Sequence, residues 1–451
     1  MRLIHTETLE FKEFFDAQIP KYAILSHRWG DDEITYKDLR KGQAPLNSSG
    51  FVKLHNFCKL AAERGFEWAW MDTCCIDKRS SAELTEAINS MYKWYERSEE
   101  CYVHLSDVRL RPDELSIKDL PADTDWPRHR HKYTSVIARF QRSSWFTRGW
   151  TLQELLAPRK LIFFDCLWRE IGPRSFLDLD IARATGIDVK WLKITPFETS
   201  CASVASRMSW ASKRHTSREE DIAYCLLGLF DVSMPLLYGE GGKKAFFRLQ
   251  NEIMKQTDDE SLFAWTADHE IGGMLATHPS CFQKSGDIVR SQWGTPRPPY
   301  SVTNKGFQFS IPEHNFSQAF QTSVPEDNAG PSNGTFPVLL CCERGPYTAG
   351  KSVVRIHLKT VSPTIHVRIH CGSLFFGDPS RLWLRGQSQE SAPKSKVIYI
   401  ATDLSVEASG MRVRQSQNGS QMFSKSEAKM EDAFPMMDEL VEDVSESEAF
   451  A

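Results

Sequence analysis

The sequence predicts an α/β fold with a mainly parallel sheet flanked by helices, then a helical extension and a separate β-rich C-terminal domain. Three observations support this prediction. In the first 165 residues, short apolar runs alternate with amphipathic helical segments, as in a parallel sheet with helices on both faces. Of 13 tryptophans, 11 lie at or before Trp265, whereas 13 of 22 prolines lie beyond residue 270. A chain of 451 residues also has room for two to three domains.

Four short apolar runs are the expected strands of the α/β domain. The first is followed by Gly30 and two aspartates, which is typical of a buried strand that enters a loop. The four runs are residues 22–26, 68–72, 101–105 and 160–164.

Three helices are expected between these strands. Residues 51–64 place their apolar side chains on one helical face and end at a glycine. Ser80-Ser-Ala-Glu83 is a capping-box pattern that opens the next helix. The third covers residues 150–156 and is halted by a proline. Residues 109–140 contain three prolines and mixed charges, so an irregular excursion is expected there.

The later part of the chain changes its periodicity twice. Residues 178–256 are helical in pattern, with a second capping box at Thr216-Ser-Arg-Glu219 and a helix over 243–256. Beyond Trp265 the period becomes two, which is typical of strands. The expected strands are residues 306–311, 337–342, 354–359, 365–370 and 396–402.

Four segments follow from these changes. Residues 1–175 form the α/β domain, 176–265 the helical extension and 266–404 the β-rich domain. Residues 405–451 are rich in Ser, Gln and Glu, so a disordered acidic tail is expected.

Composition excludes several classes of protein. Lys and Arg total 55 against 59 Asp and Glu, and a net charge of −4 argues against a nucleic-acid partner held by bulk electrostatics. We find no apolar run long enough for a membrane span and no signal peptide. The 11 cysteines are odd in number and lack C-x-x-C spacing, so we expect a reduced cytoplasmic protein without a metal site.

Polar and aromatic residues gather where the expected strands end, which is where open α/β sheets bind ligands. Glu154 lies one helical turn beyond Trp150, and a carboxylate held against an indole has a raised pKa or grips sugar hydroxyls. Glu154 as an exposed helix acid, and Asp72 and Asp77 as turn formers, remain alternatives. We expect Glu154 to share a cleft with the two strand-end loops. These loops contain Ser26, His27, Arg28 and Trp29 after the first strand, and Asp72 and Asp77 after the second.

Three long segments resemble a known family. They are YAILSHRWGDDEITYKDL (22–39), WAWMDTCCIDKRSSAELTEAINSMYKWYERSEECYVHLSDV (68–108) and SSWFTRGWTLQELLAP (143–158). In content and order they resemble the fungal heterokaryon incompatibility domain, HET, over most of residues 20–165. Residues 208–255 look like the segment that commonly follows this domain, and the β-rich region is similar to the companion C-terminal domain of that subfamily. The resemblance implies self/non-self recognition, in which the domain is a toxic effector that triggers regulated cell death.

A more distant resemblance to TIR domains depends on two short motifs. TIR domains have a Ser/Arg/Gly/Asp loop after their first strand, matched by residues 25–31, and a Trp followed by a Glu-Leu pair on a helix, matched by residues 150–155. In the enzymatically active TIR domains that glutamate is catalytic in NAD cleavage. The resemblance therefore implies a TIR-like sheet and a catalytic Glu154 that braces the nicotinamide ribose and stabilises oxocarbenium-like charge.

The same resemblance implies the rest of the binding site. Arg28 would contact phosphate and Trp29 would stack on a ring. NAD is the expected substrate, and no permanently bound cofactor is expected. The residues assigned to binding are Ser26, His27, Arg28, Trp29, Asp72, Asp77 and Trp150.

Three hypotheses about function remain open at this stage. The first is a TIR-like NAD glycohydrolase that acts on self-association. The second is an interaction module that signals cell death by assembly with itself or with protein partners and has no chemistry of its own. The third is a folded but silent relative.

Overall fold

In the computed structural model, the helices and strands follow one another within the unit Met1–Val406. The described residues are 1–111, 114, 134–194, 201–291, 299–312, 335–345, 353–362, 365–377 and 395–401. The expected acidic tail, 405–451, lies outside them, and so does most of the expected excursion at 109–140. Within that excursion, residues 134–141 are helical as α5 (Thr134–Gln141), which corrects the expectation of irregular structure there.

The described residues of the first sheet form seven strands, and the sheet is mixed. The four central strands, in the order β4-β3-β5-β6, are parallel and coincide with the four predicted runs. At the edges β1, β2 and β7 pair antiparallel, which the prediction of a mainly parallel sheet missed. The strands are β1 (Arg2–His5), β2 (Phe11–Glu13), β3 (Tyr22–His27), β4 (Trp68–Trp70), β5 (Glu100–His104), β6 (Leu161–Phe164) and β7 (Glu170–Pro173).

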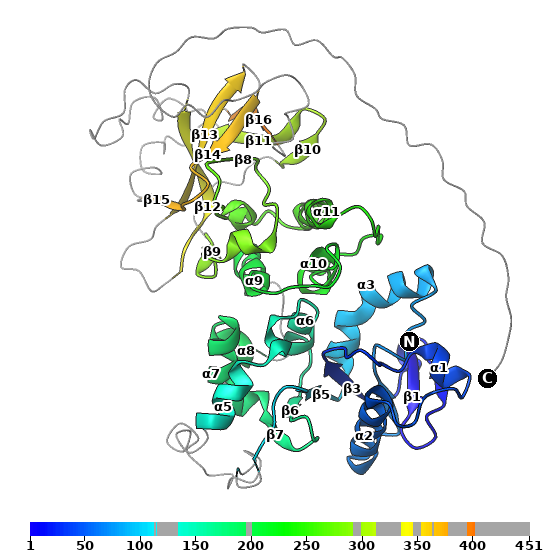
Figure 1. The fold of residues 1–451 in the computed structure, drawn as a ribbon. Coiled ribbons are helices and arrows are strands. Elements are labelled where there is room, and N and C mark those ends of the chain that lie inside the picture. Colours follow the sequence, from blue (N-terminus) through cyan, green and yellow to red (C-terminus); the bar gives the residue numbers. More distant parts are fainter. Residues whose placement is uncertain are drawn as a thin grey trace, which may run out of the picture. The chain divides into compact units, whose positions relative to one another are not determined.

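Helices cover both faces of the parallel core, as predicted (Figure 1). Helix α2 (Ser49–Glu63) covers one face, where Phe57 meets Tyr102 of β5 edge-to-face at 5.9 Å. The other face is covered by α3 (Ser81–Arg97) and α6 (Thr151–Leu156). Successive residues of a strand point to opposite faces, so neighbouring side chains of β3 reach different helices.

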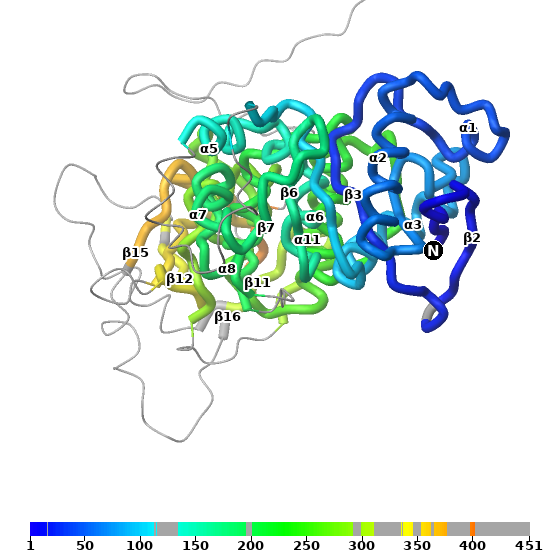
Figure 2. The backbone as a smooth tube through the Cα atoms, turned by 90° about the horizontal axis from the view of Figure 1, so that it is seen from below, coloured from blue at the N-terminus to red at the C-terminus, as the bar shows by residue number. Residues whose placement is uncertain are grey.

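Further helices lie at the β6–β7 edge of this sheet. Helices α5, α7 (Arg174–Thr185) and α8 (Val189–Lys193) gather beside β6 and β7 in both views (Figure 1, Figure 2). The short helix α1 (Tyr36–Arg40) and α2 lie toward the N-terminal strands.

The two predicted capping boxes have different outcomes. At the start of α3 the Ser80 side chain accepts from the backbone N–H of Glu83, as predicted, but Glu83 accepts from the N–H of Asp77 and pairs with Arg2. The prediction of a capping box at Thr216 is wrong, because the Thr216 hydroxyl donates to the Arg218 carbonyl and the next helix begins only at residue 221. Here a local turn competes with the helix for the hydroxyl.

The helical extension continues with α9 (Val204–Ala211), α10 (Asp221–Tyr224) and α11 (Gly242–Gln256). Its pattern of apolar residues predicted helices here, and α11 coincides with the predicted helix over 243–256 to within one residue.

The second sheet contains the predicted β-rich strands. Its order is β10-β11-β16-β14-β13-β12-β9, with β8 paired to β14 and β15 to β13. The pairing is antiparallel except between β14 and β16. The strands are β8 (Ile271–Gly272), β9 (Ile288–Arg290), β10 (Ser301–Thr303), β11 (Gly306–Pro312), β12 (Thr335–Arg344), β13 (Val353–Ser362), β14 (Ile365–Ile369), β15 (Phe375–Gly377) and β16 (Ser395–Ile400).

Strand β14 buries its polar face. His366 and Arg368 are buried, whereas the isoleucines and the valine that alternate with them are only half-buried. The Arg368 guanidinium donates to the carbonyls of Phe263 and Trp265 at 2.9 and 2.7 Å and lies 4.0 Å from the Trp265 ring centroid. A buried arginine is tolerated here because carbonyl oxygens and an aromatic face replace its water.

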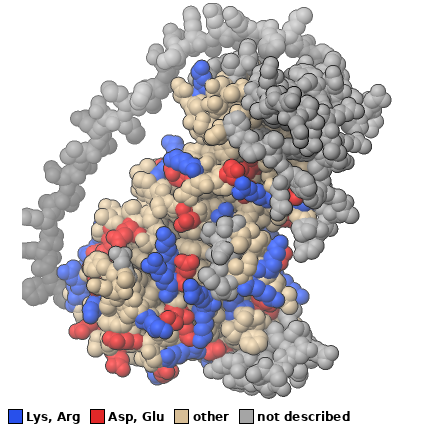
Figure 3. All heavy atoms as spheres, turned by 180° about the vertical axis from the view of Figure 1, so that it is seen from behind, with Lys and Arg blue, Asp and Glu red and all other residues tan. Residues whose placement is uncertain are grey.

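The surface charges and the cysteines do not narrow down the class of protein. Acidic and basic side chains are interspersed on the face shown in Figure 3, in keeping with the near-neutral charge. None of the 11 cysteines, all of which lie in the described part of the chain, forms a disulfide bond. None of the helices in the described part of the chain is both long and apolar enough to cross a membrane.

Candidate functional site

Glu154 lies inside the α/β region, where α6 meets β3. Its side chain is only 6% exposed, so it is not an exposed helix acid. Ser26, fully buried near the carboxyl end of β3, donates its hydroxyl to Glu154 Oε2 at 2.5 Å. The structure thus joins two predicted site residues that are 128 positions apart in the chain.

The indole beside this pair belongs to Trp145, whereas the sequence suggested Trp150. The Trp145 Nε1–H donates to Ser26 Oγ at 2.9 Å, so that Trp145, Ser26 and Glu154 form one buried hydrogen-bonded chain. Trp150 instead donates its Nε1–H to Asp221 of α10 at 3.2 Å. Its side chain is directed by an acceptor 71 residues away, which helical spacing could not reveal.

Burial controls the protonation of Glu154. Removal of the carboxyl from water, reinforced by the negative charge of Asp72, raises the pKa of Glu154 to about 8. The Ser26 hydrogen bond and the cations Arg148 and Arg214 act in the opposite direction. At neutral pH this carboxyl is therefore mostly protonated, and small changes in the surrounding charges alter its ionisation.

The two strand-end loops meet at Trp29. Its indole N–H donates to Asp72 Oδ2 at 2.7 Å, and Trp29 as a whole residue remains 41% exposed. Two cations lie over this ring, with Lys78 Nζ 3.4 Å and the Arg148 guanidinium carbon 5.5 Å from its centroid. An exposed aromatic surface surrounded by cations suits a planar ring that carries negative charge nearby.

His27 follows Ser26 in β3, so its side chain lies on the opposite face of the strand. It is buried, with Nε2 3.5 Å from Glu33 Oε1 and Nδ1 3.9 Å from Asp72 Oδ1. Burial opposes the charge of Glu33, but His27 and Lys53 outweigh it and lower the pKa of Glu33 to about 2. His27 thus lies beside the carboxylates of Glu33 and Asp72, and its burial argues against direct contact with a ligand.

Asp77 and Arg28 lie apart from the buried chain. The Asp77 carboxylate accepts from Arg79 Nε and Nη2 at 2.8 and 2.7 Å, so this residue behaves as the turn former that the sequence also allowed. The Arg79 hydrogen bonds lower the pKa of Asp77 to about 2. Arg28 is exposed on the loop that follows β3.

Sequence reasoning missed four residues of this site, namely Trp145, Lys78, Arg148 and Arg214. Trp145 and Arg148 lie within the segment that ends at Pro158, where the spacing argument favoured Trp150. Lys78 adjoins Asp77 in the chain, and its pKa is lowered because it is largely withdrawn from water.

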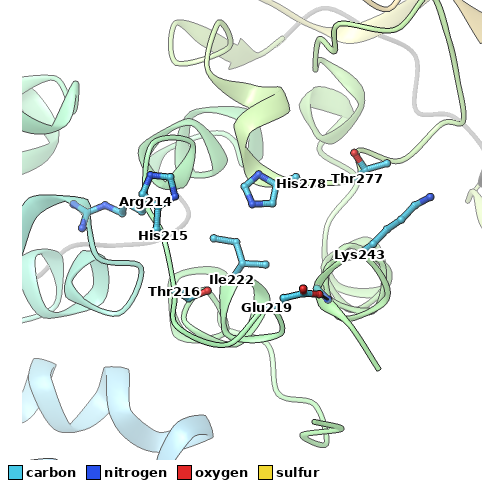
Figure 4. Close-up of a pocket in the computed structure, with 9 residues that line it drawn as sticks. Arg214, His215, Thr216, Glu219, Ile222, Lys243, Thr277 and His278 are labelled. Atoms are coloured by element: carbon cyan, nitrogen blue, oxygen red, sulfur yellow. Dashed lines mark hydrogen bonds between the residues drawn. The ribbon is translucent and has the colours of Figure 1, made fainter. Parts of the chain in front are cut away.

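The helical extension contacts the loop before α6 directly. The Gly149 N–H donates to the His215 carbonyl and the His215 N–H donates to the Thr147 carbonyl, both at 2.8 Å. Beyond this bridge lies a pocket of about 350 Å³, in which the rings of His215 and His278 lie opposite each other (Figure 4). The pocket is lined by Arg214, His215, Thr216, Glu219, Ile222, Gly242, Lys243, Thr277 and His278, and does not include Glu154.

The glycines before α11 bind a carboxylate of the chain itself. Glu220 Oε1 accepts from the N–H groups of Gly239 and Gly241 at 2.8 and 3.0 Å. Within the described residues, no group of three His, Cys, Asp or Glu side chains could hold a metal ion.

Residues 22–154, which include Ser26 and Glu154, match the family model described as Heterokaryon incompatibility protein (HET). Residues 244–287 match a model described as Domain of unknown function (DUF8212). The chain is similar to the Vegetative incompatibility protein HET-E-1 of Podospora anserina, with 46% identity over 247 residues. This match covers 54% of the chain but only 17% of that relative's length. No solved structure matches the chain.

Proposed function

We propose that this chain is a cytoplasmic effector of heterokaryon incompatibility whose α/β region triggers regulated cell death by cleaving NAD on self-association. The HET match and the similarity to a vegetative incompatibility protein support the incompatibility role. The buried Ser26–Glu154 pair, close to an exposed Trp29 and its cations, is the observation that supports NAD cleavage. The parallel core β4-β3-β5-β6, with these residues at its carboxyl edge, is compatible with a TIR-like arrangement.

In this proposal each group has a role that its surroundings allow. Trp29 stacks on a ring of NAD, while Arg28, Lys78 and Arg148 neutralise the pyrophosphate. The bond between nicotinamide and ribose breaks, and its electron pair leaves with nicotinamide. Ionised Glu154 stabilises the positive ribose, and water then adds to give ADP-ribose and a proton.

Burial of Glu154 connects the reaction to self-association. Because the side chain is only 6% exposed, substrate reaches it only after the residues that cover it rearrange. We assign this rearrangement to assembly of several chains, which would keep the isolated chain inactive.

The test is release of nicotinamide from NAD by the purified protein under conditions that force self-association. Glu154→Gln preserves the shape of the side chain and should abolish release. Glu86→Gln, an exposed acid on α3, is the matched control and should behave as wild type. Equal release by wild type and Glu154→Gln, or none by either, would overturn the enzymatic proposal.

A non-enzymatic interaction module is the second candidate, and the exposure of Trp29 favours it. Aromatic side chains exposed beside arginines are common at the centre of protein interfaces. Toxicity that survives Glu154→Gln but is lost with Trp29→Ala would support assembly alone.

A further inference from the structure

The contact between α6 and the helical extension leads through hydrogen bonds to Glu154. Arg214, which follows α9, is 2% exposed and donates from Nη1 to the Thr151 hydroxyl and to the Arg148 carbonyl, both at 2.9 Å. The Thr151 hydroxyl lies 2.6 Å from the Trp145 carbonyl, to which it donates. The Trp145 indole continues the path through Ser26 to Glu154.

Arg214 is also a buried cation that bonds mainly to neutral groups. It donates to the Thr151 hydroxyl and to the carbonyls of Arg148 and Trp210, and its Nη2 atom is buried without a hydrogen-bond partner. Burial lowers the pKa of Arg214 to about 10, whereas the neighbouring Cys225 thiol and Glu154 carboxyl favour its charged form. A buried charge is costly unless an opposite charge compensates it, so Arg214 and Glu154 are coupled.

We propose that Arg214 is a positioning residue for Glu154, so that the site is completed by the helical segment beyond the HET match. The proposal rests on the proposed function only in treating Glu154 as the functional carboxyl. Arg214 lies outside both matched regions, 22–154 and 244–287. It holds the first turn of α6 by hydrogen bonds and favours ionisation of Glu154 through its charge.

The backbone around Arg214 is arranged for this contact. Residues 147–149 and His215 form a parallel bridge, and a side chain on Gly149 would meet Thr216 Cγ2 at 2.5 Å. In Figure 4 the Arg214 side chain extends away from the pocket that His215 lines. Arg214 also belongs to the lining of that pocket, so the segment 214–216 borders both the pocket and the surroundings of α6.

The test compares two buried arginines of the same region. Arg214→Met removes the charge, whereas Arg207→Met removes a similarly buried arginine that donates to the Leu229 carbonyl. Titration of the Glu154 carboxyl by NMR and hydrogen exchange of the α6 amides are measured on the full chain. Several groups face Glu154 and are left unchanged. They are Ser26 from β3, Asp72 after β4, Tyr95 from α3, Cys101 from β5 and Arg148 before α6.

Arg214→Met should raise the pKa of Glu154 further above about 8 and speed exchange in α6. Arg207→Met should leave the Glu154 titration unchanged, and Arg214→Lys should restore it, because the positive charge is retained. Equal shifts for both Met variants, or none for Arg214→Met, would overturn the proposal. If Arg214→Met fails to fold, Thr151→Val removes the hydroxyl alone and should still speed exchange in α6, and unchanged exchange would count against the proposal. Neither readout needs NAD cleavage. A wild-type protein that releases no nicotinamide would therefore refute the enzymatic proposal, while the positioning role of Arg214 would still be tested by these two measurements.

Discussion

At the residue scale, burial sets the raised pKa of Glu154, and three nearby charged groups adjust it. The nearby Asp72 carboxylate favours the protonated form, while Arg148 and Arg214 favour the ionised form. This balance lets one substitution in a surface loop change the chemistry of a buried group. Asp72 also holds the Trp29 indole, so the same carboxylate influences both the buried acid and the exposed aromatic ring.

Asp72→Asn should therefore lower the pKa of Glu154 from about 8, because the charge that raises it is removed. An asparagine oxygen can still accept the Trp29 N–H, so the loop should keep its shape. Any nicotinamide release that needs ionised Glu154 should begin at lower pH, which a pH–rate profile measures. Asp77→Asn in the same loop is the control and should not move the profile, and an identical shift for both would contradict the assignment.

At the element scale, the bridge between residues 147–149 and 214–216 attaches the extension to the sheet. Gly149 makes this possible, since a Cβ at that position would lie 2.5 Å from Thr216 Cγ2 and 3.1 Å from Cys225 Sγ. The bridge orients the turn that leads into α6 and so contributes to the position of Glu154.

Gly149→Ala should destabilise the chain by about 1–3 kcal/mol through overpacking at this bridge. The free energy of unfolding from denaturant titration measures the effect. Gly372→Ala is the control, because its Cβ would make only an ordinary 3.6 Å contact with the Ala267 carbonyl. Equal free energies of unfolding for the two variants would contradict the prediction that the bridge has no room for a Cβ at residue 149.

Some elements could be predicted from local pattern and others could not. The strands β3, β4, β5 and β6 were predicted because a buried parallel strand is a continuous apolar run. The edge strands β1, β2 and β7 are only three or four residues long and pair antiparallel, so they carry little periodic pattern. In β14 the alternation of polar and apolar residues was visible in the sequence, but the polar face is the buried one. Arg368 can lie on that face because the carbonyls of Phe263 and Trp265 accept its hydrogen bonds.

At the scale of the whole molecule, burial of Glu154 contributes to stability in a pH-dependent way. Its pKa is about 8 in the folded chain and near its ordinary value when unfolded, so the folded state holds an extra proton between these values. The contribution is fully present below the unfolded pKa and is lost as the pH rises through the folded pKa.

The wild-type chain should lose on the order of 1 kcal/mol of stability per pH unit from this group between about pH 5 and 8. Glu154→Gln cannot titrate, so its stability should fall less over the same range. Denaturant unfolding of both proteins at pH 5.5 and 8 measures the difference. Parallel pH dependence in the two proteins would show that Glu154 does not carry the raised pKa.

The sequence alone determined the alternating order of the α/β region, the helical extension and the β-rich strands, because these follow from local periodicity. It also predicted that Ser26, Trp29 and Asp72 lie at one edge of the sheet, where Ser26 bonds to Glu154 and Trp29 to Asp72, since the ends of adjacent parallel strands meet there. Only the tertiary structure decided which indole bonds to Ser26 beside Glu154 and which arginine holds the first turn of α6. Those choices depend on hydrogen bonds between residues 60 to 130 positions apart, and such contacts leave no local pattern in the chain.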